Sequence, residues 1–301
     1  MESLIQFTNL KQFTKVFNQG NEDACKQYLI DQINKGGLKC FHCQHDKLYY
    51  IKSHSRYKCS RCEKQQSIYK GTIFEGTKLP LSTWYLAIYL ILVAKKGISS
   101  IQLAQMIGVT QKSAWYVAHR IRLTFKQPKD ALQNTVECDE TYVGGKRKGS
   151  KRGRGGEHKV PVFGMVEREG KLAAYVVENC QRKTLWPILF KSIKPHCTLM
   201  TDDFKVYKGL SRHYDHNSIN HSSGDYVRGD IHTNTIEGFW SWLKKAIKGI
   251  FHFTSKQHLQ KYVDEFVSKY NTRKMSIQTR FDTTITNIWE TITYQTLIGK
   301  I

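Results

Sequence analysis

The spacing of hydrophobic and polar positions changes near residue 128, and this change divides the chain into two parts. Before it, residues 82–95 are apolar on every side and predict a buried helix. After it, segments rich in β-branched and aromatic side chains predict strands at 135–143, 160–167 and 171–178. A short apolar run predicts a fourth strand at 197–201, and helical spacing predicts helices at 182–194, 203–210, 233–249, 255–272 and 282–295. The second part therefore has the alternation of an α/β fold.

The composition indicates a folded and strongly basic protein. The 301 residues include 47 Lys and Arg against 25 Asp and Glu, a net charge of +22, and 40% are hydrophobic, which excludes a disordered tail. This charge favours a polyanionic partner, most often nucleic acid, although a basic protein with a solvated surface also fits. The longest apolar stretch, residues 84–94, is shorter than the roughly 20 residues of a membrane-spanning helix, and the N-terminus lacks the apolar run of a signal peptide. We therefore expect a cytoplasmic protein without membrane contact.

Four of the eight cysteines form two pairs with the spacing of metal ligands: Cys40-x2-Cys43 and Cys59-x2-Cys62. Each pair places two thiolates on one tight turn, and two such turns complete a tetrahedral shell for Zn²⁺. We therefore predict a structural zinc ribbon rather than two unrelated pairs of reduced cysteines. The nearby His42 and His45 are not needed as ligands, because four sulfur atoms already fill the shell.

Residues 98–122 fit two helices separated by a turn, in which Gly108 ends the first helix and Thr110 caps the second. The start of the second helix, where a recognition helix meets base edges, offers Gln111, Lys112 and Ser113. Further along, Arg120 and Arg122 suit contacts to phosphates. A helical pair this short also occurs in ordinary protein cores. Beside a zinc ribbon, in a chain of this charge, it favours a helix-turn-helix that binds DNA.

Three acidic residues have the placement of a metal-dependent site. Asp139 lies inside the strand-like run VECDETYVGG, and Asp202 follows the short strand TLM. Glu237 lies on a predicted helix, with 34 residues between it and Asp202. Carboxylates that converge from two strands and a helix suit two Mg²⁺ ions about 3.5–4 Å apart, the arrangement of phosphoryl-transfer enzymes. Scattered surface acids are the alternative, which fits each residue alone but fits their order and spacing poorly.

The helix that carries Glu237 has one polar face and one apolar face. Asn234 lies one turn before Glu237, and Lys244 lies two turns after it on the same face. The opposite side carries an apolar stripe that suits packing on a sheet: Ile236, Phe239, Leu243, Ile247 and Ile250. A polar face with a lysine beyond the acids suits the holding of a DNA end. On the first strand, alternation predicts that Glu140 turns to the face opposite Asp139.

A basic segment follows Asp139 closely, and its six cations are Lys146, Arg147, Lys148, Lys151, Arg152 and Arg154. Each phosphate contact from this segment would add affinity that depends on salt and not on sequence. Its position after the first predicted strand suits a loop that holds scissile or target DNA. A solvated run of charge is the alternative reading.

Four motifs accompany these residues: DETYVGGKRKG at 139–149, TDDFKVYKGL at 201–210, HTNTIEGFWSWLKK at 232–245 and KYNTR at 269–273. Together with the paired cysteines, they make the chain resemble the bacterial insertion-sequence transposases of the IS1595 group, related to ISXO2-like elements. The resemblance covers roughly residues 35–275. The motifs are specific in combination, although no single one would be.

The resemblance implies an RNase H-like catalytic domain, a mixed sheet with flanking helices, behind a zinc-binding region that recognises DNA. It implies a DDE-type mechanism with Mg²⁺ or Mn²⁺, in which activated water cuts at the element's ends and the freed 3′-hydroxyl attacks target DNA. Asp139 and Asp202 match the first two acidic positions. Members of this group are often described with Asn at the third, and this chain offers both Asn234 and Glu237. The spacing to Lys244 favours Glu237, with Asn234 as a second ligand or an orienting group.

The predicted organisation has five parts: an N-terminal helical segment (1–35), a zinc ribbon (36–76), a helix-turn-helix region (80–127), an RNase H-like catalytic domain (133–275) and a C-terminal helix (276–301). On this reading the protein binds the terminal inverted repeats of its element and target DNA, both double-stranded, and cleaves and joins strands. The chemistry implies a homo-oligomer that pairs two ends. The rival readings are a non-catalytic DNA-binding regulator and a nuclease that hydrolyses without joining.

Overall fold

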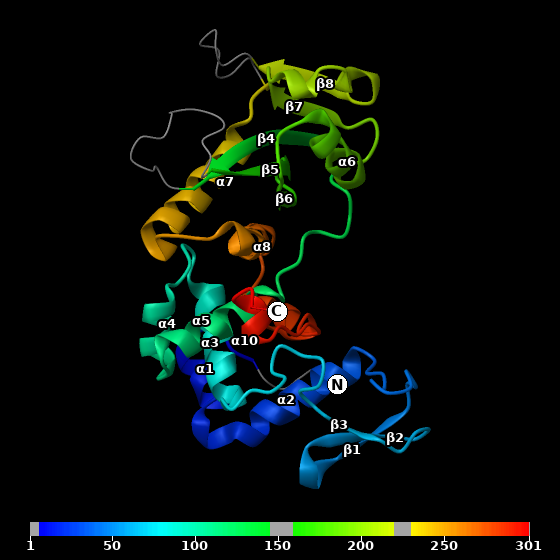
Figure 1. Ribbon diagram of the computed structural model, residues 1–301, viewed down its shortest axis with the longest axis vertical. Helices are drawn as coiled ribbons and strands as arrows, with labels where there is room; N and C mark the ends of the chain where they lie inside the picture. The colour runs from blue at the N-terminus through cyan, green and yellow to red at the C-terminus, as the bar shows by residue number, and fades with distance from the viewer. Residues whose placement is uncertain (1–5, 145–158, 220–229, 301) are drawn as a thin grey trace. The chain divides into compact units, whose positions relative to one another are not determined.

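The computed structural model describes residues 6–144, 159–219 and 230–300. The chain folds into two compact units, one made of residues 1–125 and 275–301 and the other of residues 126–274 (Figure 1). We call them unit 1 and unit 2. The C-terminal segment thus folds with the N-terminal part of the chain. Within the described ranges, no helix has the length and apolar character needed to cross a membrane.

Unit 1 is built around the buried helix α3 (Leu81–Val93), which confirms the helix predicted at 82–95. Its other helices are α1 (Leu10–Val16), α2 (Glu22–Lys35), α4 (Ser100–Ile107), α5 (Gln111–Arg122), α9 (Ile277–Thr286) and α10 (Tyr294–Leu297). Helices α2, α4, α5 and α9 all contact α3. The core holds a cluster of interlocking aromatic rings: Phe7, Phe13, Phe17, Tyr28, Tyr85 and Phe281.

A small antiparallel sheet in unit 1 has the strand order β1-β2-β3, with β1 (Leu48–Ile51), β2 (Arg56–Cys59) and β3 (Gln65–Ser67). Alternation along β2 buries Tyr57 and Cys59 and leaves Arg56 exposed. The strands therefore pair as two successive hairpins, β1 with β2 and β2 with β3.

Helices α4 and α5 form the predicted pair of helices separated by a turn. Ser99 caps α4, because its hydroxyl accepts a hydrogen bond from the N–H of Gln102 at 3.1 Å. Gly108 ends α4 in the left-handed conformation, with φ +68°, which favours glycine. Thr110 then caps α5 through the N–H of Ser113 at 3.2 Å. The predicted turn chemistry is confirmed at both helix ends.

Unit 2 contains a five-stranded mixed sheet in the order β6-β5-β4-β7-β8. Its strands are β4 (Thr135–Val143), β5 (Val160–Glu167), β6 (Leu172–Val176), β7 (Thr198–Asp202) and β8 (Asp215–Ile219). The first three are antiparallel neighbours, whereas β7 and β8 run parallel to β4. Numbered from β4, the strand order is 3-2-1-4-5, the topology of the RNase H-like fold. The predicted fold class is confirmed.

Helices cover both faces of this sheet. Helix α6 (Arg182–Ser192) packs through Leu185 and Leu189 on the face that carries Val136 and Cys138. Helices α7 (Asn234–Ala246) and α8 (Lys256–Asn271) pack on the other face, and a π-helical turn, η6 (Ile247–Phe251), follows α7. The apolar stripe predicted for α7 is buried at Ile236, Phe239, Leu243 and Ile247 and half-buried at Ile250.

Two of the predicted elements differ from the structure, and one strand of the structure was not predicted. Residues 203–210 form no α-helix but lie in two 3₁₀ turns, η3 (Lys205–Tyr207) and η4 (Leu210–Arg212). Strand β8 was not predicted, because its sequence DHNSI is polar and its place at the sheet edge needs little apolar surface. The helix predicted at 282–295 is in fact α9, which ends at Thr286, followed by the single turn α10.

Side-chain amides cover the outer edge of β6. Asn271 accepts from the N–H of Leu172 at 2.7 Å and donates to its carbonyl at 2.8 Å. Gln127 makes the same pair of contacts with Ala174, at 3.1 and 2.9 Å. Gln260 accepts from the N–H of Val176 at 2.6 Å. These amides substitute for a neighbouring strand, and Asn271 accounts structurally for part of the KYNTR motif.

Candidate active site

Three acidic side chains converge near the middle of the unit 2 sheet. Asp139 lies in the centre of β4, Glu140 follows it, and Asp202 ends the adjacent parallel strand β7. One carboxylate oxygen of each lies within 4.8 Å of the others. The strand order brings Asp139 and Asp202 together, since β4 and β7 are neighbours although 62 residues separate these two positions in sequence.

Asp139 faces helix α7, where the indole Nε1 of Trp240 donates to its Oδ2 at 3.0 Å. The residue paired with Asp139 on the neighbouring strand β5 is Gly164, and a Cβ at Gly164 would lie 2.5 Å from the Trp240 ring. Glycine is therefore needed for the indole to reach the carboxylate. Burial, followed by the charges of Glu140 and Asp202, raises the pKa of Asp139 to about 7, against the opposing hydrogen bonds from the Glu140 N–H and the Trp240 indole.

The side chain of Glu140 points as alternation predicts but lies closer to Asp139 than expected. It is buried on the α6 face of the sheet, where the hydroxyl of Tyr207 donates to its Oε2 at 3.0 Å. Even so, one of its oxygens belongs to the cluster with Asp139 and Asp202. The predicted face is confirmed, and the length of the glutamate side chain lets one of its oxygens approach those of Asp139 and Asp202 all the same.

Asp202 is 8% exposed and closes the turn that follows β7, since its Oδ1 accepts from the N–H of Phe204 at 3.0 Å. The neighbouring Asp203 is exposed and lies outside the cluster. The two adjacent aspartates of the TDD motif thus have different environments, and only the first is placed beside Asp139.

Helix α7 carries the candidate third ligands. Asn234 and Glu237 are both exposed, and Glu237 accepts from the hydroxyl of Thr233 at 3.0 Å. Measured around the helix from Trp240, Glu237 lies about 60° away, Lys244 about 40° and Asn234 about 120°. Glu237 therefore lies nearer the side of α7 that meets Asp139, although its carboxylate is not in the cluster found among the described residues.

Lys244 lies close enough to Asp139 for the two charges to interact. Burial lowers the pKa of Lys244, and the carboxylate of Asp139 opposes that shift. The ammonium group is therefore within electrostatic reach of the first acid, and its role at the site stays a prediction.

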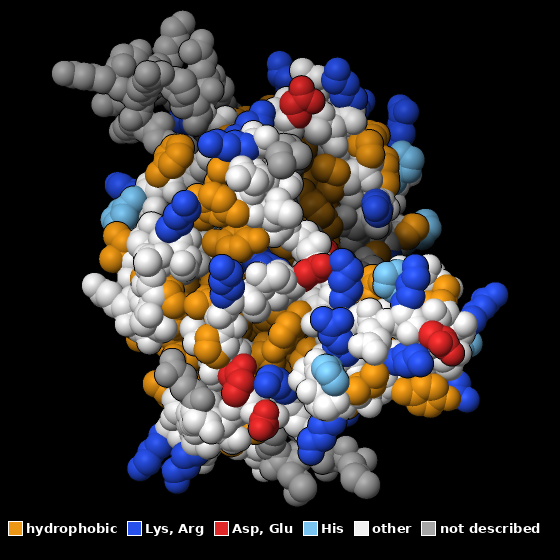
Figure 2. All heavy atoms as spheres, turned by 60° about the horizontal axis from the view of Figure 1, so that its bottom comes forward, with side chains coloured by type: hydrophobic (Ala, Val, Ile, Leu, Met, Phe, Trp, Pro, Cys, Tyr) orange, Lys and Arg blue, Asp and Glu red, His pale blue; other side chains and the backbone are white. Residues whose placement is uncertain are grey.

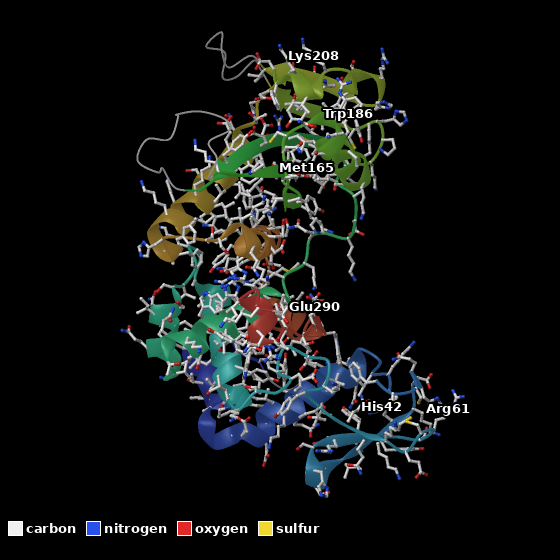
Figure 3. The ribbon with its side chains drawn as sticks, viewed as in Figure 1. His42, Arg61, Met165, Trp186, Lys208 and Glu290 are labelled. Carbon is white, nitrogen blue, oxygen red and sulfur yellow. The ribbon has the colours of Figure 1, made fainter. Side chains whose placement is uncertain are left out.

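The four paired cysteines meet at one end of the small sheet, with one sulfur of each, in Cys40, Cys43, Cys59 and Cys62, within 4.8 Å of the others. The Sγ atoms of Cys40 and Cys62 are 3.7 Å apart, and those of Cys43 and Cys59 are 3.6 Å apart. Tetrahedral bonds of about 2.3 Å place sulfur atoms about 3.8 Å apart, so the cluster fits Zn²⁺. The backbone N–H groups of His42 and Arg61, labelled in Figure 3, donate to two of the sulfurs at 3.4 Å.

The predicted base-reading residues on α5 all have partners within unit 1. The amide of Gln111 donates to the Ser100 hydroxyl at 2.7 Å, and the Ser113 hydroxyl lies 2.9 Å from that of Thr110. The ammonium of Lys112 lies 4.8 Å from the centre of the Tyr294 ring, on the C-terminal segment. Gln111 and Lys112 are nonetheless exposed at the start of the helix.

Arg120 and Arg122 are each 3% exposed, so the structure does not support the phosphate contacts expected of them. Arg120 donates to the carbonyls of Thr72 and Glu75 at 3.4 and 2.8 Å and lies over the ring of Trp84. The last turns of α5 face the core, which the amino-acid types alone did not indicate.

The six cations predicted to line the loop after β4 lie outside the described residues: Lys146, Arg147, Lys148, Lys151, Arg152 and Arg154. On the face drawn in Figure 2, lysines and arginines are spread widely and acids are sparse.

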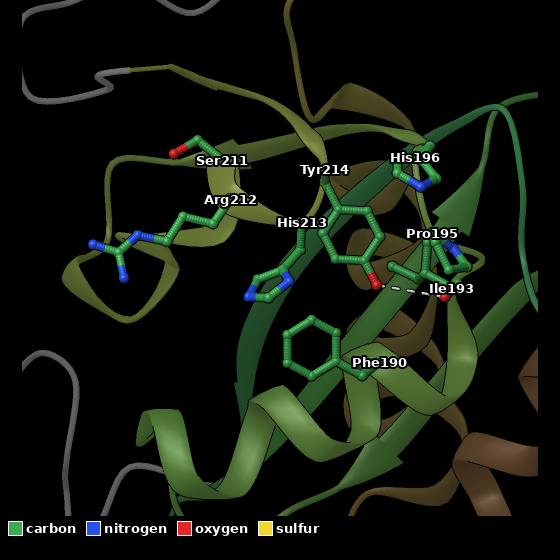
Figure 4. A pocket seen from close by; sticks show the side chains of 8 residues that line it. All are labelled: Phe190, Ile193, Pro195, His196, Ser211, Arg212, His213 and Tyr214. Carbon is green, nitrogen blue, oxygen red and sulfur yellow. Dashed lines mark hydrogen bonds between the residues drawn. The ribbon is translucent and has the colours of Figure 1, made fainter.

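A separate cavity of about 530 Å³ lies at the start of β7 and β8, the ends of those strands opposite Asp202. Its lining, shown in Figure 4, consists of Phe190, Ile193, Pro195, His196, Ser211, Arg212, His213 and Tyr214. Tyr214 donates to the carbonyl of Ile193 at 3.4 Å. None of the clustered acids lines this cavity.

Sequence reasoning missed the role of Trp240 and Gly164 at the acid cluster. Trp240 is 4% exposed and packs in the core of unit 2, and its indole also holds Asp139. The sequence signal for this contact is Gly164, a glycine inside an otherwise apolar strand, which is typical of a close approach by a neighbouring element.

The sheet order and the buried acids on β4 and β7 define an RNase H-like protein of the nuclease and transposase class. Residues 131–271 match the ISXO2-like transposase domain, and residues 20–65 match the transposase zinc-ribbon domain. The chain belongs to the IS1595 family of transposases.

Individual proteins are similar to this chain to different extents. A protein of the transposable element ISH50 from Halobacterium salinarum is 28% identical over 262 residues, 79% of this chain and 87% of that protein. A transposase-like protein of Haemophilus influenzae is 30% identical over 109 residues, 36% of this chain and 87% of that protein. A chain of the pre-cleavage Mos1 transpososome is 12% identical with a TM-score of 0.27, over 68% of this chain and 79% of that chain.

Proposed function

We propose that this protein is the transposase of an insertion sequence, which binds the terminal inverted repeats of its element and cuts and joins DNA strands. The observation that carries the proposal is the meeting of Asp139 and Asp202 at adjacent strands, beside a helix with Glu237 and Lys244. Family membership supports a transposase, and the acid cluster supports metal-dependent phosphoryl transfer.

The donor set fits divalent cations with a preference for oxygen. Three carboxylates within 4.8 Å repel one another, and burial raises the pKa of Asp139 to about 7. A bound cation would relieve this repulsion, and carboxylate oxygens are the ligands that Mg²⁺ and Mn²⁺ prefer. Asp139 and Asp202 would hold two ions, with Glu237 as the third ligand and Asn234 as a second ligand or an orienting group. Bound there, the ions would supply Lewis-acid activation of the attacking oxygen and stabilisation of the leaving oxygen.

The remaining residues of the site orient its charged groups. The indole of Trp240 holds Oδ2 of Asp139 through a hydrogen bond and so orients this carboxylate. Lys244 supplies a cation beside Asp139 that suits a backbone phosphate of the DNA end. In the cleavage step, a bond forms between phosphorus and the water oxygen while the bond to the leaving 3′-oxygen breaks. In joining, the oxygen of that freed 3′-hydroxyl forms a bond to a phosphorus of target DNA while the bond from that phosphorus to the target's own 3′-oxygen breaks, so the target strand leaves with a 3′-hydroxyl.

Unit 1 supplies DNA recognition in this proposal. A structural Zn²⁺ on Cys40, Cys43, Cys59 and Cys62 would hold the ribbon together. Gln111, Lys112 and Ser113 at the start of α5 would meet base edges, after Lys112 leaves the Tyr294 ring. The basic residues between 146 and 154 would contact phosphates. Paired cutting of two ends calls for a homo-oligomer on DNA.

A joining assay in Mg²⁺ tests the proposal, with a donor plasmid that carries the gene's native flanking DNA. Wild type is compared with Asp202→Ala and with Asp203→Ala, a matched control at the exposed neighbouring acid. We expect joined product from wild type and the control and none from Asp202→Ala, which should still shift the end DNA. Cleavage without joining would indicate a nuclease, and uncut but shifted DNA from all three would indicate a regulator.

The same assay distinguishes the two candidates for the third ligand. We expect Glu237→Ala to lose cleavage by more than about 100-fold and Asn234→Ala by much less, because a carboxylate offers Mg²⁺ a charge that an amide lacks. The opposite order of effects would assign the third position to Asn234.

A further inference from the structure

A third acidic residue of β4, Glu137, lies on the same face as Asp139 and is fully buried. Its Oε2 accepts from the backbone N–H groups of Thr235 and Ile236, at 2.8 and 3.1 Å. Its Oε1 accepts from the hydroxyl of Thr235 at 2.9 Å. These donors form the first turn of α7, where N–H groups have no partner within the helix. One carboxylate therefore ties the start of α7 directly to β4.

Arg168 completes this attachment from the segment after β5. Its Nε donates to Oε1 of Glu137 at 2.9 Å, and its Nη2 donates to the carbonyl of His232 at 3.1 Å. The imidazole Nδ1 of His232 lies 3.3 Å from Oε1 of Glu137. A carboxylate with no exposed surface is strongly destabilising unless it is paired and hydrogen-bonded. The groups around Glu137 belong to the first turn of α7, to His232 just before it, and to Arg168. Displacement of α7 would therefore deprive a buried carboxylate of most of its donors.

The spacing of this attachment matches that of the indole contact at Asp139. Glu137 and Asp139 are two residues apart on a strand, a rise of about 7 Å. Thr235 and Ile236 precede Trp240 by five and four residues on a helix, a rise of about 6–7.5 Å. The two contacts therefore fix α7 along β4 at two points with equal spacing on both elements. A shift of α7 by one residue would break at least one of them.

We propose that Glu137, with Arg168, is a positioning residue of the active site that sets the register of α7 against β4. That register brings the Trp240 indole to Asp139 and sets Glu237 and Lys244 on the side of α7 nearer to Asp139. The effect on catalysis rests on the proposed function, whereas the effect on the Trp240–Asp139 contact does not.

The test compares Glu137→Gln with Glu265→Gln in the full-length chain. Glu265 is equally buried, in unit 2, and pairs with Lys269 on α8 at 2.6 Å, so its substitution also removes a buried charge but leaves the α7 attachment intact. The readout is the indole ¹⁵N–¹H resonance of Trp240, assigned among the six tryptophans with Trp240→Phe and recorded without DNA or magnesium. Arg168→Lys serves as a second variant that keeps the charge and loses the fork to His232.

We expect Glu137→Gln and Arg168→Lys to move the Trp240 resonance, and Glu265→Gln to leave it in place at a comparable loss of thermal stability. In the cleavage assay, the first two variants should lower the turnover rate by about 10- to 100-fold, with the DNA concentration for half-saturation unchanged within about twofold. An unmoved Trp240 resonance in either folded variant would overturn the proposal, as would an equal movement in Glu265→Gln. If wild type itself does not cleave, the proposed function fails, and the resonance alone decides the positioning role.

Discussion

Replacement of Asp139 by Asn removes a buried charge without a change of shape. The carboxamide oxygen can still accept from the Trp240 indole, so the contact between β4 and α7 is retained. What changes is the repulsion that Asp139 shares with Glu140 and Asp202 within the 4.8 Å cluster. In the absence of magnesium, we expect the Asn variant to be more stable than wild type at alkaline pH.

The magnitude and its sign follow from the pKa of Asp139, which rises from an ordinary value of 3.8 to about 7 in the folded state. Between these values the folded state binds more protons at Asp139 than the unfolded state does, so the contribution of this group to stability is most favourable below pH 4 and is lost as the pH rises to 7. Each pKa unit corresponds to about 1.4 kcal/mol. Because Asp139 keeps some exposure to solvent, the loss above pH 7 is at most about 4 kcal/mol.

Urea titrations at pH 5, 6 and 8 measure this difference, with zinc kept bound and magnesium left out. Hydrogen exchange of peptides from β5 and α8 reports on unit 2 alone, and comparison of the two proteins at one pH cancels intrinsic exchange rates. The advantage of Asp139→Asn should be largest at pH 8 and shrink toward pH 5. Asp203→Asn, at the exposed neighbouring acid, is the control and should change little.

Addition of Mg²⁺ at pH 8 should then stabilise wild type and not the Asn variant, because only wild type retains the charged ligand. The reasoning is refuted if the advantage of Asp139→Asn is absent at pH 8 or is the same at every pH. In the first case Asp139 would carry no penalty of burial, and in the second the effect would not come from its ionisation.

Three further outcomes follow from individual contacts. Cys59→Ser should release zinc, measured by native mass spectrometry, and weaken binding to element ends in a gel-shift assay, whereas full zinc content would contradict the predicted ligand set. Gly164→Ala should destabilise unit 2 by about 1–3 kcal/mol in urea unfolding, since the added Cβ lies 2.5 Å from the Trp240 ring, and an unchanged midpoint would show that α7 yields easily. Arg120→Ala should destabilise unit 1 by about 2–3 kcal/mol but leave the salt dependence of DNA binding unchanged, and a shallower salt dependence would restore Arg120 as a phosphate contact.

The strands that set the site could be predicted because their burial leaves a strong pattern. Strands β4 and β5 lie inside the sheet, and their enrichment in β-branched and aromatic residues predicts strands with the observed bounds. Strand β8 could not be recognised in this way, since a polar edge strand is formed by its pairing with β7 and not by its own apolar surface.

Some features of the candidate site could likewise be predicted from the sequence, whereas others depend on tertiary packing. The types and order of Asp139 and Asp202 indicated their roles, because metal ligation needs carboxylates and the chain order matches adjacent strands. The contact of Trp240 with Asp139, the attachment through Glu137 and the burial of Arg120 depend on how helices seat on a neighbour. Amino-acid type does not reveal this, since tryptophan, glutamate and arginine each suit several environments. The choice between Glu237 and Asn234 stays a prediction.

The amides along β6 have a consequence for assembly. A strand at the edge of a sheet is the usual place for one copy of a chain to add to another, because its backbone groups are unpaired. In this protein Asn271, Gln127 and Gln260 already occupy those groups on β6, so a second copy cannot extend the sheet there without displacing three side chains at once. Any pairing of protomers around two DNA ends is therefore directed to helices, loops or the opposite edge at β8, and the β6 edge is also protected against uncontrolled aggregation.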